Sequence, residues 1–401
     1  MKKILGILLL GFLFSGKANA GINEPGISLL SPQCKLNFKI EHDKIKKSLK
    51  KNQTAVLYGS CNNGRWSYAS DKGKNLKRLH KKTFKECMKY ADEFTGTECF
   101  LYAVNEEVVW KHDKVKEAAI LEERQAQLNK RPGNFFIYNI DDSLPKKWVA
   151  EFENIMNVLQ DVIPIPNNMN EYLKNPGMDI YAWKSSKKNP FPKVKNNMKG
   201  ACICGNGSDR WMQLEINSNE FKNKEIHRYS VIPHEYFHVY QIALSKNKLS
   251  DRDSPKWLTE GQAKVFEEMY VKQYYEKDNL KNDLSRTKKW SKKVFKEPEL
   301  YEKHKTSNKK GMDGNYAGSA FMVLALINEL EQNNISERKA FQLVFRDFWI
   351  ERANNRKWEK AFEQTFKISA EEFYERLSKY KRKDYKTILP SDTIKIQEIF
   401  S

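Results

Sequence analysis

The pattern of apolar and polar residues in the second half of the chain predicts a small sheet followed by helices. Residues 135–138, 178–183 and 211–216 are short apolar-rich runs of the kind that forms strands. Residues 144–162 repeat apolar side chains at the spacing of a helix. These runs predict three strands, with a helix between the first two.

Helical patterns dominate after residue 230 and continue nearly to the C-terminus. Apolar residues recur every three to four positions in residues 321–330, and again around Phe362, Phe366, Phe373 and Leu377. A small sheet followed by helices indicates an α+β fold.

The first twenty residues have the order of a cleavable signal peptide. Two lysines precede an apolar run at residues 4–14, and the small-residue sequence Ala-Asn-Ala follows at residues 18–20. The mature chain is therefore expected to begin at Gly21. No later stretch approaches the roughly 20 apolar residues that a membrane helix requires. We expect a soluble bacterial protein that is periplasmic or secreted.

Six cysteines follow this leader, and an even count in an exported chain favours disulfides over free thiols. They are Cys34, Cys61, Cys87, Cys99, Cys202 and Cys204. Spacing alone leaves the pairing open. The last two permit a tight disulfide ring or a metal site, and the glycines at positions 200, 205 and 207 indicate a loop there.

About 380 mature residues exceed one average domain, so two units are expected. Residues 21–110 hold four cysteines and short strand-like runs, which predicts a small disulfide-tied α/β domain. A charged helical stretch within residues 111–133 ends in a Pro-Gly breaker and is the expected linker. Residues 134–401 form the second expected domain.

The chain carries a formal charge of +20, of which about +17 remains without the leader. Such a charge favours anionic surfaces or acidic substrates. Nucleic acid is not expected as a partner, because the lysines are spread along the whole length and no zinc-finger or helix-turn-helix pattern focuses them. A solvated lysine-rich surface is the alternative.

The pattern HExxH occurs at residues 234–238. His234 and His238 lie on one face of a helix and can reach one zinc ion, since neutral imidazole binds zinc well. Glu235 is placed to accept a proton from a metal-bound water as general base. Ser230 is expected to cap this helix, because Pro233 fits only near a helix start.

A second segment supplies a third candidate ligand. Ser254 suits the N-cap of another predicted helix, and Pro255 suits its first turn. Glu260 then lies about a turn and a half inside this helix, 22 positions after His238.

The segment Trp257-Leu258-Thr259-Glu260-Gly261-Gln262-Ala263 resembles the WLxEGxA segment that follows the HExxH helix in gluzincin zinc metallopeptidases, which include bacterial peptidase MA-like proteins. The resemblance implies a zincin-like catalytic domain with Glu235 as catalytic base. It implies that Glu267 supports the ligands. The Zn²⁺ ligands that it implies are His234, His238 and Glu260.

Further resemblances are shorter. Asn315-Tyr316-Ala317-Gly318 resembles a gluzincin segment whose tyrosine steadies the tetrahedral intermediate, which implies a catalytic role for Tyr316; a helix-capping tyrosine is the alternative. Lys264 stands where thermolysin-like members have an aspartate, which argues against that branch. Residues 87–105 resemble a small secreted module in which a helix cysteine is tied to one before a strand.

Together these patterns predict a secreted metalloprotease, a hydrolase that cuts peptide bonds of a protein or peptide substrate with a zinc-activated water. Residues 211–216 are expected at the sheet edge that pairs with substrate backbone, or in ordinary core packing. A non-catalytic zinc-containing binding or adhesion protein with a basic surface is the competing hypothesis, and a zinc hydrolase of a non-peptide bond is another. Three protein ligands predict an open fourth position, unlike a structural site.

Overall fold

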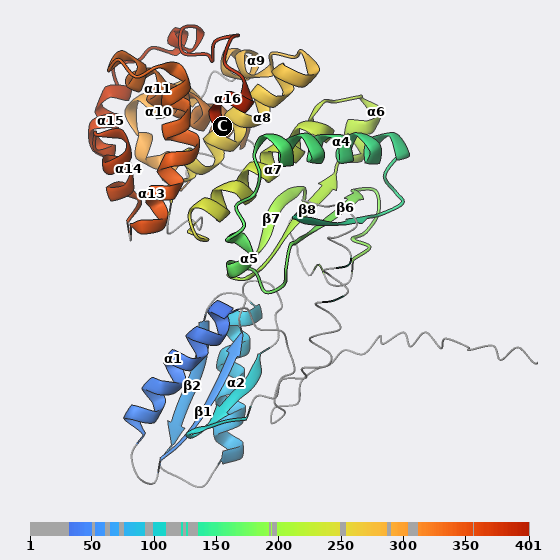
Figure 1. Cartoon of the computed structure of the whole chain (residues 1–401), viewed down its shortest axis with the longest axis vertical. Helices are drawn as coiled ribbons and strands as arrows, with labels where there is room; N and C mark the ends of the chain where they lie inside the picture. The colour runs from blue at the N-terminus through green and yellow to red at the C-terminus, as the bar shows by residue number, and fades with distance from the viewer. Residues whose placement is uncertain are drawn as a thin grey trace, which may run out of the picture. The chain divides into compact units, whose positions relative to one another are not determined.

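The computed structural model covers most of the chain after residue 31. It describes residues 32–49, 53–60, 65–71, 76–92, 99–109, 122, 126, 135–191, 194, 199–248, 254–286, 290–303, 312–355 and 357–400. The expected signal peptide, nearly all of the expected linker, Cys61 and the side chain of Cys34 lie outside this set. The chain forms two compact units with the main division after Asp113, and each is considered separately (Figure 1).

The N-terminal unit contains an antiparallel sheet with strand order β2-β1-β3-β4. Its elements are α1 (Pro32–Ser48), β1 (Thr54–Ser60), β2 (Arg65–Asp71), α2 (Leu76–Asp92), β3 (Phe100–Val104) and β4 (Glu107–Val108). A disulfide joins Cys87 of α2 to Cys99, directly before β3, as the resemblance at these residues implied. This link ties together a small core that includes Val56, Tyr58 and Leu101, where limited apolar burial makes a covalent staple valuable.

The C-terminal unit begins with a mixed sheet of order β5-β6-β8-β7. Its elements are β5 (Phe136–Ile140), α4 (Lys146–Val162), α5 (Met169–Tyr172), β6 (Met178–Lys184), β7 (Ala201–Asn206) and β8 (Asp209–Ile216). Strands β5, β6 and β8 run parallel, while β7 is antiparallel to β8. The three predicted strands and the helix between the first two are present, within two residues of their predicted bounds.

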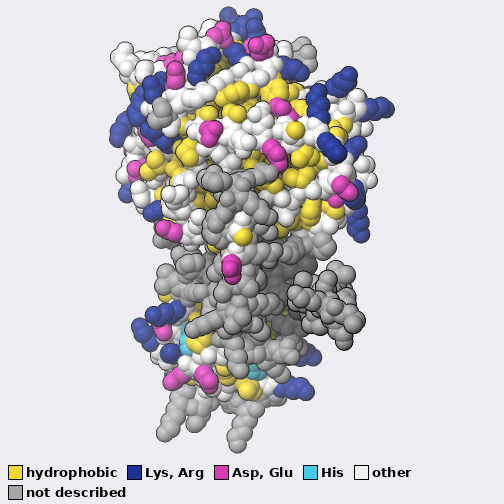
Figure 2. All heavy atoms as spheres, turned by 45° about the vertical axis from the view of Figure 1, so that its right-hand side comes forward, with side chains coloured by type: hydrophobic (Ala, Val, Ile, Leu, Met, Phe, Trp, Pro, Cys, Tyr) yellow, Lys and Arg dark blue, Asp and Glu magenta, His cyan; other side chains and the backbone are white. Residues whose placement is uncertain are grey.

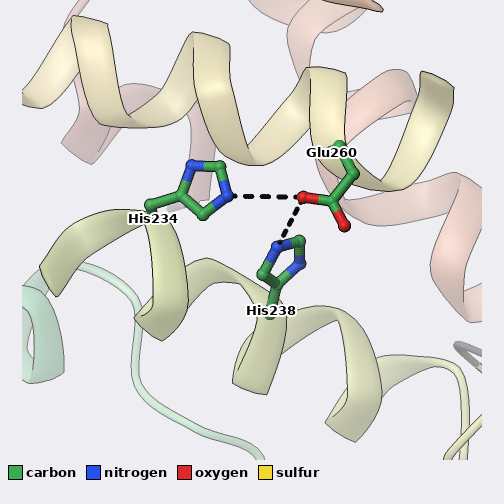
Figure 3. Close-up of side chains that lie close together, drawn as sticks. All are labelled: His234, His238 and Glu260. Carbon is green, nitrogen blue, oxygen red and sulfur yellow. Dashed lines mark hydrogen bonds and ion pairs between the residues drawn. The ribbon is translucent and has the colours of Figure 1, made fainter. Parts of the chain in front are cut away.

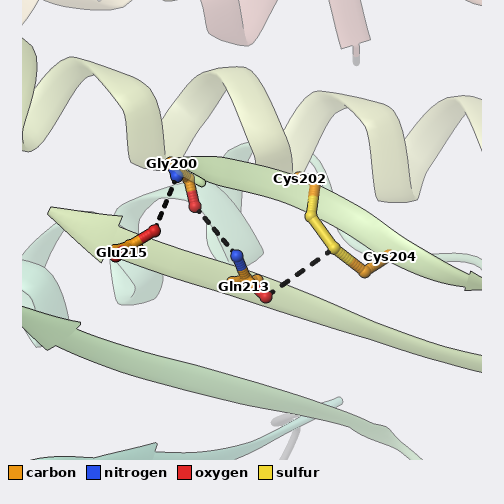
Figure 4. Close-up of a disulfide and its surroundings, with 5 residues drawn as sticks. All are labelled: Gly200, Cys202, Cys204, Gln213 and Glu215. Atoms are coloured by element: carbon orange, nitrogen blue, oxygen red, sulfur yellow. Dashed lines mark hydrogen bonds between the residues drawn. A yellow bond between two sulfur atoms is a disulfide. The ribbon is translucent and has the colours of Figure 1, made fainter. Parts of the chain in front are cut away.

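The position and pairing of strand β7 differ from two expectations of the sequence analysis. Cys202 and Cys204 lie in this strand rather than in a loop, and they form a disulfide beside Gln213 of β8 (Figure 4). The neighbouring glycines serve a tight hairpin: Gly207 has a φ of +57° in the turn, and a side chain on Gly205 would meet the carbonyl oxygen of Asp209. Because β7 pairs with β8, the segment 211–216 lies inside the sheet and is not its edge.

The remainder of the unit is helical, which agrees with a mixed α+β fold. These elements are α6 (Ser218–Lys222), α7 (His227–Leu244), α8 (Lys256–Tyr275), α9 (Asn279–Arg286), α10 (Trp290–Lys296), η1 (Pro298–Glu302), α11 (Met312–Gln332), α12 (Glu337–Gln342), η2 (Leu343–Asp347), α13 (Phe348–Asn354), α14 (Trp358–Phe366), α15 (Ala370–Leu377), η3 (Arg382–Lys386) and α16 (Ile396–Phe400). Among the described helices, none is both long and apolar enough to cross a membrane.

One large core runs from the sheet into the helices. Ile180 and Ala182 of β6, with Met212 and Leu214 of β8, alternate onto the sheet face that belongs to this core, and Figure 1 shows α4 and α7 along the sheet. The opposite face packs Trp211 and Cys204 against the segment that contains Val194. Helix α7 is therefore held between the sheet on one side and α8 on the other.

Candidate metal centre

Helix α7 supplies the two histidines. It is buried almost all round from Tyr229 to Ala243, as expected of a helix enclosed by other elements. It begins at His227, so the expected N-cap role of Ser230 is wrong: this serine lies inside the helix and its hydroxyl donates to Glu267. Pro233 lies in the second turn, where its missing N–H leaves one helical hydrogen bond unmade.

Helix α8 supplies the third candidate ligand. It begins at Lys256 with Pro255 at the N-cap, so the expected cap at Ser254 is also wrong; the Ser254 hydroxyl donates to Lys248 instead. Glu260 is the fifth residue of the helix, as predicted. The fully buried Trp257 anchors this first turn by donating its indole N–H to the Tyr374 hydroxyl at 3.0 Å.

The two helices bring His234, His238 and Glu260 together (Figure 3). Oε2 of Glu260 lies 3.4 Å from Nε2 of His234 and 3.2 Å from Nε2 of His238, and all three ligand atoms lie within 4.8 Å of one another. Ligand atoms about 2.0–2.2 Å from a tetrahedral metal ion are about 3.3–3.6 Å apart. The cluster can therefore hold a metal ion.

The outer nitrogen of each imidazole has its own acceptor. Nδ1 of His234 lies 3.1 Å from Oε2 of Glu267, and Nδ1 of His238 lies 2.8 Å from Oε1 of Gln241. A proton held on Nδ1 by these acceptors leaves the Nε2 lone pair free for a metal. Glu267 thus contacts a candidate ligand histidine, while its supporting role stays a prediction.

The electrostatics of the cluster favour positive charge. Burial alone lowers the pKa of His234, but the hydrogen bonds to Glu260 and Glu267 outweigh it and raise this pKa to about 10. Burial raises the pKa of Glu260, yet the nearby histidines hold it well below its usual value. A bound cation would take the place of the protons that balance these carboxylates.

Glu235 lies beside the cluster on α7 and is 5% exposed. Its Oε2 is buried and has no hydrogen-bond partner among the described residues, and burial raises the pKa of this carboxyl. An unpaired carboxylate oxygen is costly unless a ligand or water satisfies it. Two imidazoles, one carboxylate and this adjacent unsatisfied oxygen fit a divalent cation that also carries a water.

Tyr316 also lies at the site. It belongs to α11 as an internal helical residue and so is not a cap, and its ring centroid is 5.9 Å from that of His234. The charge of Glu260, and then burial, raise its pKa, which keeps the phenol protonated. Its position matches the expectation that the resemblance raised, while its catalytic role stays a prediction.

Several site residues were not anticipated from the sequence. Gln241 lies three positions after His238, and Ser230 lies four positions before His234. Lys256 lies four positions before Glu260, and its ammonium pairs with this carboxylate at 3.3 Å. Helical spacing could have indicated all three, because residues three or four apart share a face. Of the other described histidines, His42 and His80 bond within the N-terminal unit, and His227 pairs with Glu220. His112 and His304 lie outside the described residues.

A comparison with protein-family models, curated proteins and solved structures finds no match to this chain. The case for its function therefore rests on the site itself.

Proposed function

We propose that this protein is a secreted zinc metallopeptidase of the gluzincin type. The observation that carries the proposal is the convergence of two imidazole Nε2 atoms and one Glu260 oxygen beside the unpaired Oε2 of Glu235. Two histidines and one carboxylate are a ligand set of catalytic zinc, which keeps a fourth position for water or substrate. The zincin-like fold and the signal peptide are parts of this proposal.

The chemistry follows from what each side chain can do. A zinc ion in such a site lowers the pKa of water and polarises a carbonyl group. Glu235 accepts the proton of the attacking water at its free carboxylate oxygen and delivers it to the leaving amine. Burial raises the pKa of Glu235, which brings the carboxyl closer to the range in which it both accepts and returns a proton.

Tyr316 serves as the donor to the developing oxyanion in this proposal. Its protonated phenol lies next to His234 and is kept neutral by the surrounding carboxylates. A donor that is already in place where negative charge develops stabilises the transition state without reorganisation.

The test is Glu235→Gln in the full chain. We expect the variant to keep one zinc ion, because the amide does not remove a ligand, and to lose about 10²–10⁴-fold in peptide cleavage, because the base is gone. Zinc content and cleavage of a peptide library are measured on both proteins. Glu371→Gln, an exposed position on α15, is the matched control and should behave as the parent.

Other outcomes separate the competing hypotheses. Zinc without cleavage by the parent protein would favour a binding or adhesion protein or a hydrolase of another bond, and absence of zinc would remove the site assignment. The visible surface gives no separate support to a nucleic-acid partner. On the face shown in Figure 2, Lys and Arg side chains are interspersed with Asp and Glu rather than gathered in one patch.

A further inference from the structure

Lys264 is a partly buried cation one turn after Glu260 on α8. Its side chain is 15% exposed and contacts three carboxylates. Its Nζ lies 2.5 Å from Oε1 of Glu268, 3.5 Å from Oε1 of Glu267 and 3.3 Å from Oδ2 of Asp283 on α9. Lysine pays a large desolvation penalty when buried, so this arrangement needs the surrounding negative charge.

Glu267 connects this cation to the metal cluster. Its Oε1 accepts from the Ser230 hydroxyl at 2.6 Å and faces Lys264, while its Oε2 lies 3.1 Å from Nδ1 of His234. Both oxygens are thus engaged, and the carboxylate is oriented by groups from α7 and α8. An unbroken series of contacts runs from Lys264 through Glu267 to a candidate metal ligand.

The two neighbouring carboxylates are not equivalent. Both are almost fully buried, and burial alone raises the pKa of each. For Glu267, the charge of Lys264 and the hydrogen bond with His234 reverse this effect and hold its pKa below the usual range. For Glu268 burial prevails, and its pKa is raised to about 7. The single cation therefore lies beside the carboxylate that contacts Nδ1 of His234.

We propose that Lys264 is a positioning residue of the metal centre: its ammonium holds the Glu267 carboxylate in place, and this carboxylate in turn holds His234 with Nε2 directed at the metal. The inference rests on the metal centre of the proposed function and does not depend on peptide cleavage. Without Lys264, Glu267 would be a buried carboxylate with one fewer counter-charge and would bind His234 less strongly.

The experiment measures zinc affinity of the full chain by competition with a chromogenic chelator. Lys264→Met removes the ammonium but keeps most of the stem, and we expect zinc to bind about 10–100-fold more weakly, the range for loss of a partner that supports a ligand. Lys264→Arg keeps the charge and should restore most of the affinity. Lys272→Met, a more exposed lysine of the same helix, is the matched control and should bind zinc as the parent does.

A second readout separates positioning from general stabilisation. Cobalt(II) replaces zinc, and its visible spectrum reports the geometry of the ligands. We expect the spectrum to change in Lys264→Met and to remain that of the parent in Lys272→Met. An unchanged zinc affinity and cobalt spectrum in Lys264→Met would overturn the inference, even if the variant were less stable to heat.

If Lys264→Met does not fold, Lys264→Met combined with Glu268→Gln decides the question. This double variant removes one buried positive and one buried negative charge, so the net charge of the cluster is kept. Weaker zinc binding in it would support the inference, and parental affinity would overturn it. A parent that binds zinc but cleaves nothing would count against the peptidase proposal alone.

Discussion

At the residue scale, two buried histidines show how surroundings decide what one side chain can do. His234 lies between two carboxylates, which raise its pKa to about 10. His80 of the N-terminal unit is 2.8 Å from the Tyr58 hydroxyl, and burial lowers its pKa. The first environment favours a cation, whereas the second favours a neutral ring that accepts a hydrogen bond.

The His80 pair predicts a pH dependence of stability. Because its folded-state pKa is lowered, the unfolded chain binds more protons as the pH falls below the unfolded value of about 6.5. The free energy of unfolding of the N-terminal unit should therefore decrease as the pH drops below about 6.5. The total decrease should be on the order of 1 kcal/mol for each pH unit between the folded-state and unfolded-state pKa values of His80. Hydrogen exchange of β1 and α2 amides at pH 7.5 and 5.5 measures this.

His80→Gln is the comparison for that experiment, since its amide can accept from Tyr58 and does not titrate. Its pH dependence over the same range should be smaller than that of the parent. Equal slopes for the two proteins would assign the effect to other groups.

At the element scale, α8 is the helix that completes the site, and its position depends on how closely α11 approaches it. Gly261 follows the candidate ligand Glu260, and a methyl group there would lie 2.4 Å from the carbonyl oxygen of Ser319 on α11. The candidate ligand is therefore followed directly by a glycine at which α8 and α11 approach closely. Trp257, hydrogen-bonded to Tyr374, fixes the preceding turn.

We predict that Gly261→Ala destabilises the protein by about 1–3 kcal/mol, because a rigid backbone atom cannot yield to the new methyl group. The same change should weaken zinc binding, since α8 must move away from α11 with Glu260. Urea unfolding and chelator competition measure the two effects.

Gly318→Ala is the comparison, because its methyl group would meet the ring of Tyr301, a side chain, at 2.4 Å rather than backbone. We expect it to cost less stability and to leave zinc affinity nearer that of the parent. A larger effect at Gly318 on both measurements would contradict this account of α8.

At the scale of the whole molecule, the two units have separate hydrophobic cores. The large core draws its buried residues from Phe136 onward, and the core around Val56 and Tyr58 draws its own from the N-terminal unit. The metal cluster lies wholly among residues of the first of these cores.

We therefore predict that a fragment of residues 134–401 folds and binds zinc with the affinity of the full chain, because every buried residue of its large core is retained. Circular dichroism and chelator competition compare the two proteins. Loss of zinc binding by a folded fragment would show that the N-terminal unit contributes to the site.

Features that depend on the spacing of residues along a single helix or strand could be predicted from the sequence. The four-residue spacing of His234 and His238 already places them on one helix face, and apolar periodicity located the three strands and the helix between the first two. The tail around Phe362 and Phe373 was likewise predicted to be helical and is so. Helix starts were predicted less well: α7 begins at His227, three residues before Ser230, and the N-cap of α8 is Pro255 rather than Ser254.

The sequence by itself determined which residues are suited to hold a metal and act as base, because those properties belong to side-chain type and to spacing along one helix. Only the tertiary structure decided that Glu260 meets both histidines, that β7 rather than β8 forms the edge, and that Lys264 lies against Glu267. The contacts at the cluster depend on how α7, α8 and α9 pack, and the sheet edge depends on which strands pair. Neither follows from the order of residues in a single element.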